Sequence, residues 1–245
     1  METRFDITVR HRGPVIVVHP RGRLTVHSAT ALHEILAKKL RNHGQVVVDL
    51  DGFALDHAAG VDIFPAVMTE CGGWPVAKLV LCRLDPQMAQ VLTTRQVSSL
   101  VPVHPLLLQA EAAIDRRPDI VRLQTPLPGG PRASVRARQL VRDICPLWQI
   151  DDDLQDTAQV VASELADITA HAATAAGLTL EQGPRGLVVA IRDASPSLVP
   201  RPRECSTDLL RRGQGVGLEM LANLTAAWGV EVHPDGKTAW AKIST

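Results

Sequence analysis

Three features in the second half of the chain have the residue types of a phosphate-handling site. Glu164, in the run SELADI, carries a carboxylate able to accept a proton. Asp193 ends the apolar run LVVAIRD, so we expect its carboxylate at a strand end, pointing beyond it. The third feature is a glycine loop before a helical run, where backbone amides can receive phosphate, at Gly213, Gly215 and Gly217. The order and spacing of the three features carry more information than any one of them.

The first half contains a turn that is suited to a modifiable hydroxyl but has none. The apolar run VVVDL is followed by DGFALDHAAGVDIF, which predicts a strand, a turn and a helix. The residues at the start of that helix are Asp56, His57, Ala58 and Ala59. An alanine cannot accept a phosphoryl group. We interpret His57 as an exposed turn histidine, with pH sensing as the alternative.

Composition excludes several classes of partner. The 245 residues include 26 Lys and Arg and 26 Asp and Glu, so zero net charge gives no general attraction to nucleic acid or anionic membrane. The N-terminus lacks the apolar core of a signal peptide, and no run is long enough to span a bilayer, so we expect a cytoplasmic protein. Four cysteines lack paired spacing, which favours reduced thiols over a disulfide or zinc site: Cys71, Cys82, Cys145 and Cys205.

The elements that must position these residues fall into two α/β units. Before about Ile114, short β-branched runs alternate with amphipathic runs, and Arg12, Gly13 and Pro14 form an expected hairpin turn. A helix should close on Gly44. This pattern predicts a small mixed sheet with helices packed on it.

The second unit follows a stretch rich in proline and glycine. The run DRRPDIVRLQTPLPGGPRA predicts a linker at residues 116–133, which separates domains at 1–115 and 134–245. After it come two helical runs, the second with acidic residues at its start. Two hairpins follow, with turns near Gln182 to Gly186 and Pro234 to Gly236, which indicates helices over an antiparallel sheet.

Residues 127 to 245 resemble the GHKL (Bergerat-type) ATP-binding fold, specifically the anti-sigma factor serine kinases abundant in actinobacteria. The resemblance is carried by SVRARQLVRD, VVASELADITAHAA, VVAIRDASP, RRGQGVGLEMLANLTAAWGVEV and GKTAWAKI, in family order. It implies an α/β sandwich that binds ATP. It also implies that Asp193 accepts a hydrogen bond from adenine, that the glycine loop wraps the phosphates, and that Glu164 helps to activate a target hydroxyl.

This resemblance has one departure, at the position of the magnesium ligand. Family members typically read S-E-L-V-T-N, and the asparagine that binds magnesium is Ile168 here. Magnesium requires oxygen ligands, which isoleucine lacks, so the departure removes a ligand of the magnesium that stabilises phosphate charge during phosphoryl transfer. Asp167 is an alternative ligand, although it lies about 100° around the helix. Four arginines could instead offset phosphate charge without metal: Arg201, Arg203, Arg211 and Arg212.

Residues 3 to 115 resemble a STAS domain, the anti-anti-sigma fold. The run VVVDLDGFALDHAAGVDIF aligns with the family pattern V-V-D-L-S-G-V-x-F-x-D-S-S-G-L, supported by LVLCRLDPQMAQVL and SLVPVHPLLLQAEAAI. In that family a partner kinase phosphorylates the first serine of D-S-S-G, which is Ala58 here. The resemblance therefore implies a STAS domain that lacks the phosphorylation switch.

Together the two losses favour a protein that works by binding. Our leading hypothesis is a non-catalytic regulator of a sigma-factor partner-switching network, an anti-sigma factor antagonist whose second domain could sense ATP. Its expected partners are an anti-sigma factor kinase, a sigma factor or a STAS protein. One alternative is an active, ATP-dependent serine kinase that uses Glu164, and another is a small-ligand sensor. Magnesium binding and homodimer formation are left open.

Overall fold

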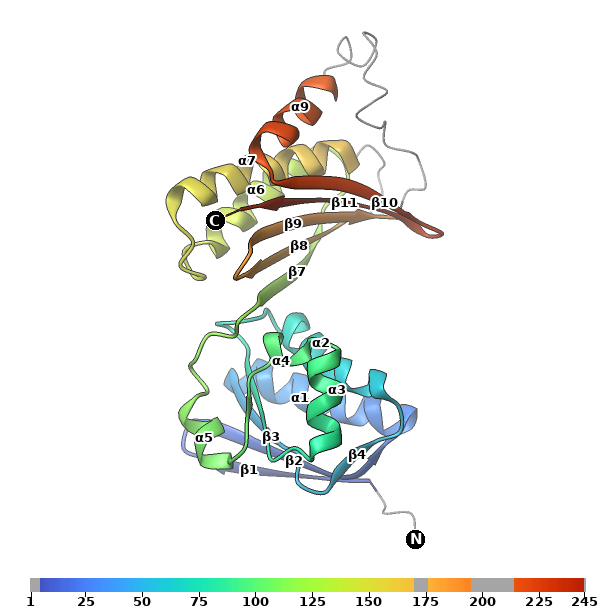
Figure 1. The fold of residues 1–245 in the computed structure, drawn as a ribbon, viewed down its shortest axis with the longest axis vertical. Coiled ribbons are helices and arrows are strands. Elements are labelled where there is room, and N and C mark those ends of the chain that lie inside the picture. The colour runs from blue at the N-terminus through green and yellow to red at the C-terminus, as the bar shows by residue number, and fades with distance from the viewer. Residues whose placement is uncertain (1–4, 170–175, 195–213, 245) are drawn as a thin grey trace. The chain divides into compact units, whose positions relative to one another are not determined.

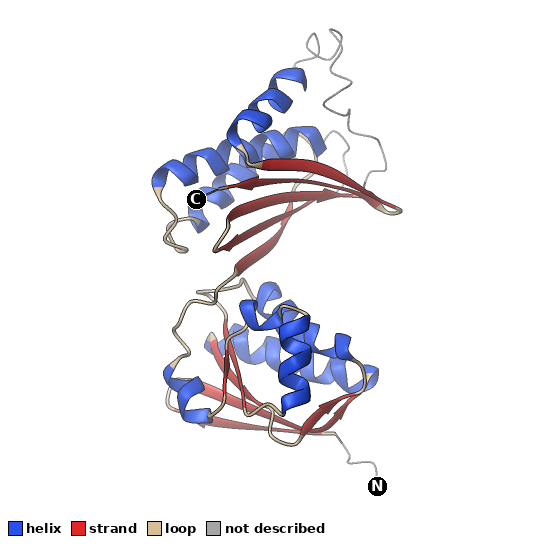
Figure 2. Cartoon of the chain, viewed as in Figure 1, coloured by secondary structure: helices blue, strands red, loops and turns tan. Residues whose placement is uncertain are grey.

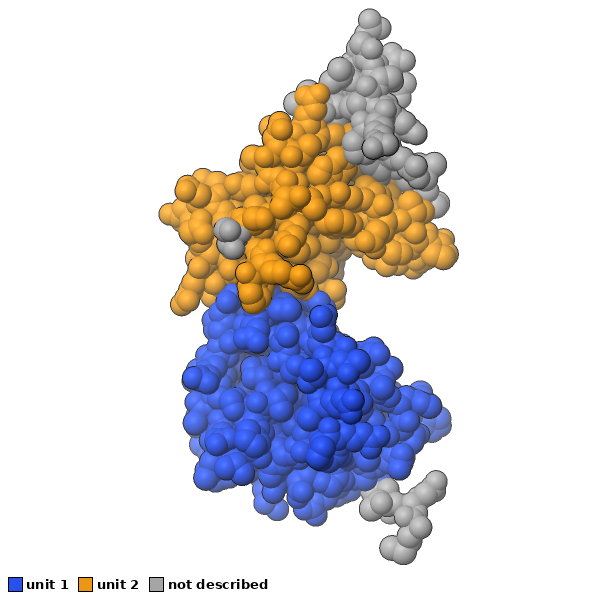
Figure 3. Space-filling model, viewed as in Figure 1, with its two compact units in different colours: residues 1–122 blue, residues 123–245 orange. Residues whose placement is uncertain are grey.

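The computed structural model describes residues 5–169, 176–194 and 214–244, which fall into two compact units (Figures 1 and 3). Unit 1 is Met1–Arg122 and unit 2 is Leu123–Thr245. Each unit has its own sheet and helices (Figure 2). No helix of the described residues is both long and apolar enough to cross a membrane.

Unit 1 is built on a mixed, 6-stranded sheet in the order β1-β2-β3-β5-β6, with β4 paired to β2. β1 and β2 form an antiparallel hairpin, and the other pairs are parallel. The strands are β1 (Asp6–Arg12), β2 (Val15–Leu24), β3 (Gln45–Asp49), β4 (Phe53–Leu55), β5 (Lys78–Cys82) and β6 (Val103–His104). The mixed sheet and the hairpin turn at Gly13 confirm the sequence-based predictions.

Helices cover the two faces of this sheet unequally. The larger core lies under α1 (Val26–His43), α2 (Ile63–Glu70), α3 (Pro86–Thr94) and α4 (Val97–Leu100). Of the described helices, α5 (Leu107–Ala112) alone lies on the other face (Figure 1), where it packs on a small cluster that includes Val17, Val47 and Val80. Because adjacent side chains on a strand point to opposite faces, Val46 and Val48 contribute to the larger core and Val47 to the smaller.

Local sequence explains where α1 begins and ends. Thr25 caps its N-terminus in a reciprocal capping box with Ser28. Gly44 ends it in the left-handed conformation, with φ of 71°, and its amide donates to the carbonyl of Leu40. A non-glycine residue is rare at such a φ, so the predicted C-cap is confirmed.

Unit 2 has a 5-stranded sheet in the order β10-β11-β9-β8-β7. Its strands are β7 (Val121–Leu127), β8 (Ala176–Gly183), β9 (Gly186–Asp193), β10 (Ala227–His233) and β11 (Gly236–Ile243). Both predicted hairpins, β8-β9 and β10-β11, are present and antiparallel. One face is covered by α6 (Arg132–Ile144), α7 (Asp152–Thr169) and α9 (Gln214–Leu224) (Figure 1).

Two expectations about local structure were wrong. The segment expected to be a linker contains β7, because Val121, Leu123 and Leu127 alternate with more exposed residues and bury one side of the strand. The glycine loop was expected to precede a helix, but Gly215 and Gly217 lie within α9, and Gly213 is outside the described residues.

Candidate functional site

The turn after β4 presents its residues to solvent. β4 pairs with β2, and the Asp56 amide continues that pairing by donating to the Leu24 carbonyl at 3.1 Å. The chain then enters the 3₁₀-helix η1 (Ala58–Asp62), which continues into α2. All four residues singled out in the sequence are exposed: Asp56, His57, Ala58 and Ala59. The structure thus brings them together at a helix N-terminus, as predicted.

Close packing beneath the turn fixes its path. A Cβ added at Gly60 would lie 3.1 Å from Leu55 Cδ2 and 3.3 Å from Leu24 Cδ2. These distances are shorter than ordinary van der Waals contacts, so a side chain at position 60 would push η1 away from the sheet. Val61, the next residue, is fully buried in the larger core. The exposed turn is therefore held by buried contacts on either side of it.

A cavity of about 320 Å³ lies beside this turn. Its lining comes from the end of β2, β4, the turn and the start of α3, and includes Asp56, His57, Ala58, Met88 and Val91. Asp85 caps α3 by accepting from the Met88 amide at 2.7 Å, which orients that wall of the cavity. None of the lining residues carries a hydroxyl group.

Ion pairs flank the turn on both sides. Arg23 on β2 lies 3.5 Å from the Asp56 carboxylate, measured between Nη1 and Oδ1. Asp62 at the end of η1 is held by both Nε and Nη2 of Arg95. Both pairs are solvent-exposed, so they orient side chains more than they stabilise the fold.

In unit 2, α7 brings Glu164 against α9. A Cβ added at Gly217 would lie 2.3 Å from Glu164 Oε2, so only glycine leaves room for this carboxylate where it stands. Burial and the neighbouring Asp167 carboxylate raise the pKa of Glu164, and Arg138 partly opposes them. Two of the predicted site residues thus lie in contact.

The predicted magnesium position does not supply oxygen ligands. Ile168 is half-buried on α7, one turn after Glu164, and Asp167 is exposed. Among the described residues, no group of three or more His, Cys, Asp or Glu side chains could hold a metal. The residues present therefore do not fit a magnesium ion bound in the family's manner.

Asp193 is placed differently from the sequence-based expectation. Its side chain is 2% exposed and lies on the inner face of the sheet with Val189 and Ile191, rather than beyond the strand end. Lys237, directly opposite on β11 and also buried, has its Nζ 3.5 Å from Asp193 Oδ2. This buried ion pair gives Asp193 a structural partner that the sequence did not reveal. Gly213 and the four predicted arginines lie outside the described residues.

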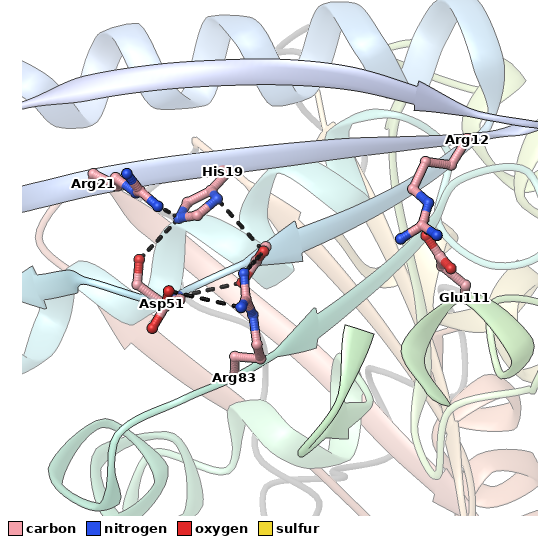
Figure 4. A network of polar contacts seen from close by, with 7 residues as sticks. Arg12, His19, Arg21, Asp51, Arg83 and Glu111 are labelled. Atoms are coloured by element: carbon pink, nitrogen blue, oxygen red, sulfur yellow. Dashed lines mark hydrogen bonds and ion pairs between the residues drawn. The ribbon is translucent and has the colours of Figure 1, made fainter. Parts of the chain in front are cut away.

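Sequence reasoning missed one polar cluster, on the face of the unit 1 sheet that carries α5 (Figure 4). Asp49, at the end of β3, accepts hydrogen bonds from Nε and Nη2 of Arg83. Burial raises the pKa of Asp49, but the bonds from Arg83 and from the Asp51 amide outweigh it, so the net shift is downward. The only available signal was an acid that interrupts an apolar strand.

A protein-family model described as the STAS domain matches residues 6–110. A STAS domain therefore occupies most of unit 1. No curated protein matches the chain.

Three solved structures similar to the chain share little sequence with it. An anti-sigma factor antagonist from Mycobacterium paratuberculosis is 20% identical, with a TM-score of 0.41, covering 45% of this chain and 94% of that one. An anti-sigma factor antagonist (STAS) domain protein from Planctomyces limnophilus is 17% identical, with a TM-score of 0.36, covering 46% and 99%. The Bacillus protein SpoIIAA, in its unphosphorylated form, is 14% identical, with a TM-score of 0.35, covering 45% and 95%. Identities and TM-scores this low carry no information on function.

Proposed function

We propose that the chain is a non-catalytic regulator of a sigma-factor partner-switching network, of the anti-sigma factor antagonist type. Its STAS domain binds an anti-sigma factor kinase through the surface around η1. This binding is constitutive with respect to phosphorylation, because positions 58 and 59 are alanine.

One observation carries the proposal. The turn keeps an exposed, well-positioned helix N-terminus beside a cavity, while neither the turn nor the cavity lining offers a hydroxyl. A phosphoserine would bring close to two negative charges to this surface and weaken a contact by repulsion and desolvation. Without an acceptor, the surface stays in its binding-competent state.

The second part of the proposal is that unit 2 binds ATP without magnesium. Its support is the helix-over-sheet arrangement, in which α9 packs on α7 and contains Gly215 and Gly217. Calorimetry of ATP binding with and without magnesium tests this part. We expect the same affinity in both, and a Kd that depends strongly on magnesium would overturn it.

Restoring the acceptor tests the main proposal. Purified anti-sigma factor kinases of the source organism are titrated into the intact chain by calorimetry, and each complex is then incubated with labelled ATP. We expect one kinase to bind the wild-type chain and to transfer no label to it. The Ala58→Ser variant should bind the same kinase, accept the label and then release the kinase.

The neighbouring alanine provides a matched control. Ala59→Ser adds the same hydroxyl one residue away, and the STAS pattern predicts that it accepts little or no label. Binding of no kinase to the intact chain would overturn the proposal. Label on the wild-type chain would show that the switch has moved to another residue, and would also count against it.

An active kinase is the second candidate, favoured by the position of Glu164. A carboxylate with a raised pKa, held against α9, suits a general base. This candidate predicts phosphate transfer from ATP to a separate STAS protein, abolished in Glu164→Gln. Unchanged transfer in that variant, or none in the wild type, would exclude it.

A further inference from the structure

We propose that unit 1 has a second binding site, for a small molecule that carries a phosphate group, on the sheet face beside α5. The site is a cavity of about 400 Å³ that shares no lining residue with the cavity at the turn. Its volume is within the range of small-molecule sites, about 300 to 1,000 Å³. This inference is independent of the proposed partner binding.

The strand register gathers the basic residues of this cavity. On β2, Val17, His19 and Arg21 alternate along one face of the sheet, the face that carries α5. On β1, Arg10 pairs with Val17 and therefore shares that face. Arg12, two residues further on, also lines the cavity. Because α5 covers only the part around Val15, Val17 and Val47, the basic part stays open to solvent.

The buried carboxylate in the floor of the cavity is held by ion pairs. Asp49 is 2% exposed and is held by two nitrogens of Arg83, with Nε to Oδ1 at 2.7 Å. Arg83 also lies 3.7 Å from Asp51, and His19 Nδ1 lies 3.5 Å from Asp49. These contacts, drawn in Figure 4, pair the buried Asp49 carboxylate with Arg83, and the more exposed Asp51 carboxylate shares the same arginine.

Two arginines at the rim have no such carboxylate partner. Arg21 donates from Nε to Nε2 of His19 at 3.0 Å. Neither Arg21 nor Arg10 forms an ion pair within the described parts of the chain, whereas Arg12 pairs with Glu111 at 3.2 Å. The lining of the cavity therefore includes two guanidinium groups that have no carboxylate partner among the described residues and are available to an anion.

The charge and shape of the cavity favour a phosphate monoester over a simple carboxylate. Two guanidinium forks match a dianion, and each can form paired hydrogen bonds with phosphate oxygens. The cavity is larger than a phosphate group alone requires, and Val17 and Leu107 give it an apolar side. This arrangement suits a phosphate attached to a small organic group.

Titration of the intact chain with inorganic phosphate tests the proposal. Amide chemical shifts are followed by NMR at constant ionic strength, with chloride as the reference anion, up to about 10 mM phosphate. We expect saturable shifts at residues of β1 and β2. Glucose 6-phosphate, which adds an organic group to the same phosphate, should bind more tightly, and acetate more weakly.

Charge-matched variants distinguish a specific phosphate site from general electrostatic attraction to a basic surface. Arg10→Gln and Arg21→Gln should each weaken phosphate binding about tenfold. Both side chains are exposed, so the variants should fold, which the amide spectrum itself verifies. Lys38→Gln removes the same charge from the exposed side of α1, which packs on the other face of the sheet, and should leave binding unchanged.

The outcomes that would overturn the proposal are distinct. Shifts that do not saturate, or no shifts at all, would show that no phosphate site exists. An equal loss in Lys38→Gln and Arg10→Gln would show attraction to net charge only. None of these results bears on whether a kinase binds at the turn, because the two cavities are lined by different residues.

Discussion

A negative charge placed at the turn should weaken partner binding without weakening the fold. In Ala58→Glu the new side chain starts from an exposed position at the first residue of η1. A carboxylate at a helix N-terminus is favourable by about 0.3 to 1 kcal/mol, and repulsion from Asp56 opposes it by a similar amount. We therefore expect the free energy of unfolding to change by less than about 0.5 kcal/mol.

The effect on binding should be much larger, because the partner would cover the new charge. An unpaired charge buried in an interface costs about 2 to 5 kcal/mol, which corresponds to a loss of about thirtyfold or more in affinity. Ala58→Gln has a side chain of the same length without the charge, so it measures the steric part alone. The difference in affinity between the two variants isolates the electrostatic part.

Two measurements test whether the turn lies in the interface with the kinase and whether the fold is unchanged. Calorimetry with the bound kinase gives Kd for the wild type and both variants, and urea unfolding gives their stabilities. Equal affinities for Ala58→Glu and Ala58→Gln would refute the placement of the turn in the interface. A loss of more than about 1 kcal/mol in stability would refute the expectation that a charge at position 58 leaves the fold unchanged.

Three further variants, one of them with a matched control, test the structure of the two units. Asp49→Asn should lower the stability of unit 1 by about 2 kcal/mol at pH 7 in urea unfolding, because it leaves a partly buried arginine without its carboxylate. Folding lowers the pKa of Asp49, so the wild type should be more stable than the Asp49→Asn variant by the full amount above about pH 5, and this difference in stability should disappear as pH falls through the folded-state pKa. A difference in stability that does not change with pH would contradict this. Gly73→Ala should lower the stability of unit 1 by about 2 kcal/mol or more, because φ is 65° and the new Cβ would lie 2.4 Å from the Arg122 carbonyl oxygen. Gly13→Ala is the control: φ is 61° but the space around the new Cβ is open, so the loss of stability should be about half as large. Glu164→Gln should stabilise unit 2 slightly at pH 7, with the gain vanishing as pH falls below the raised pKa of Glu164, and a loss of stability would show that the carboxylate forms a favourable contact.

Local signals in the sequence predicted much of the fold. Gly44 as a helix cap and the turn at Gly13 both depend on residues a few positions apart. β7 was missed because the prolines at its end outweighed the alternation of Val121 and Leu123 in our interpretation. That strand is stabilised by pairing with β8, about fifty residues later, which no local pattern reveals.

The same distinction applies to the candidate sites: features set by neighbouring residues could be predicted, and features that join distant residues could not. The exposed alanines at the turn could be predicted, because a contiguous run of residues determines them. The contact between Glu164 and Gly217, and the pairing of Asp193 with Lys237, join residues that are far apart in the chain. The basic cavity was not predicted at all, because its members come from β1, β2, α5 and the ends of β3 and β5 and are adjacent only once the sheet has formed.

The missing hydroxyl at the turn also changes what kind of response such a protein can produce. A partner that is released by covalent modification responds to the activity of an enzyme, whatever the amount of protein. With alanines at positions 58 and 59, occupancy of the kinase under the proposed function follows mass action alone. The free kinase would then fall sharply once the copy number of this chain exceeds that of its target. Synthesis and degradation of the chain would set the threshold.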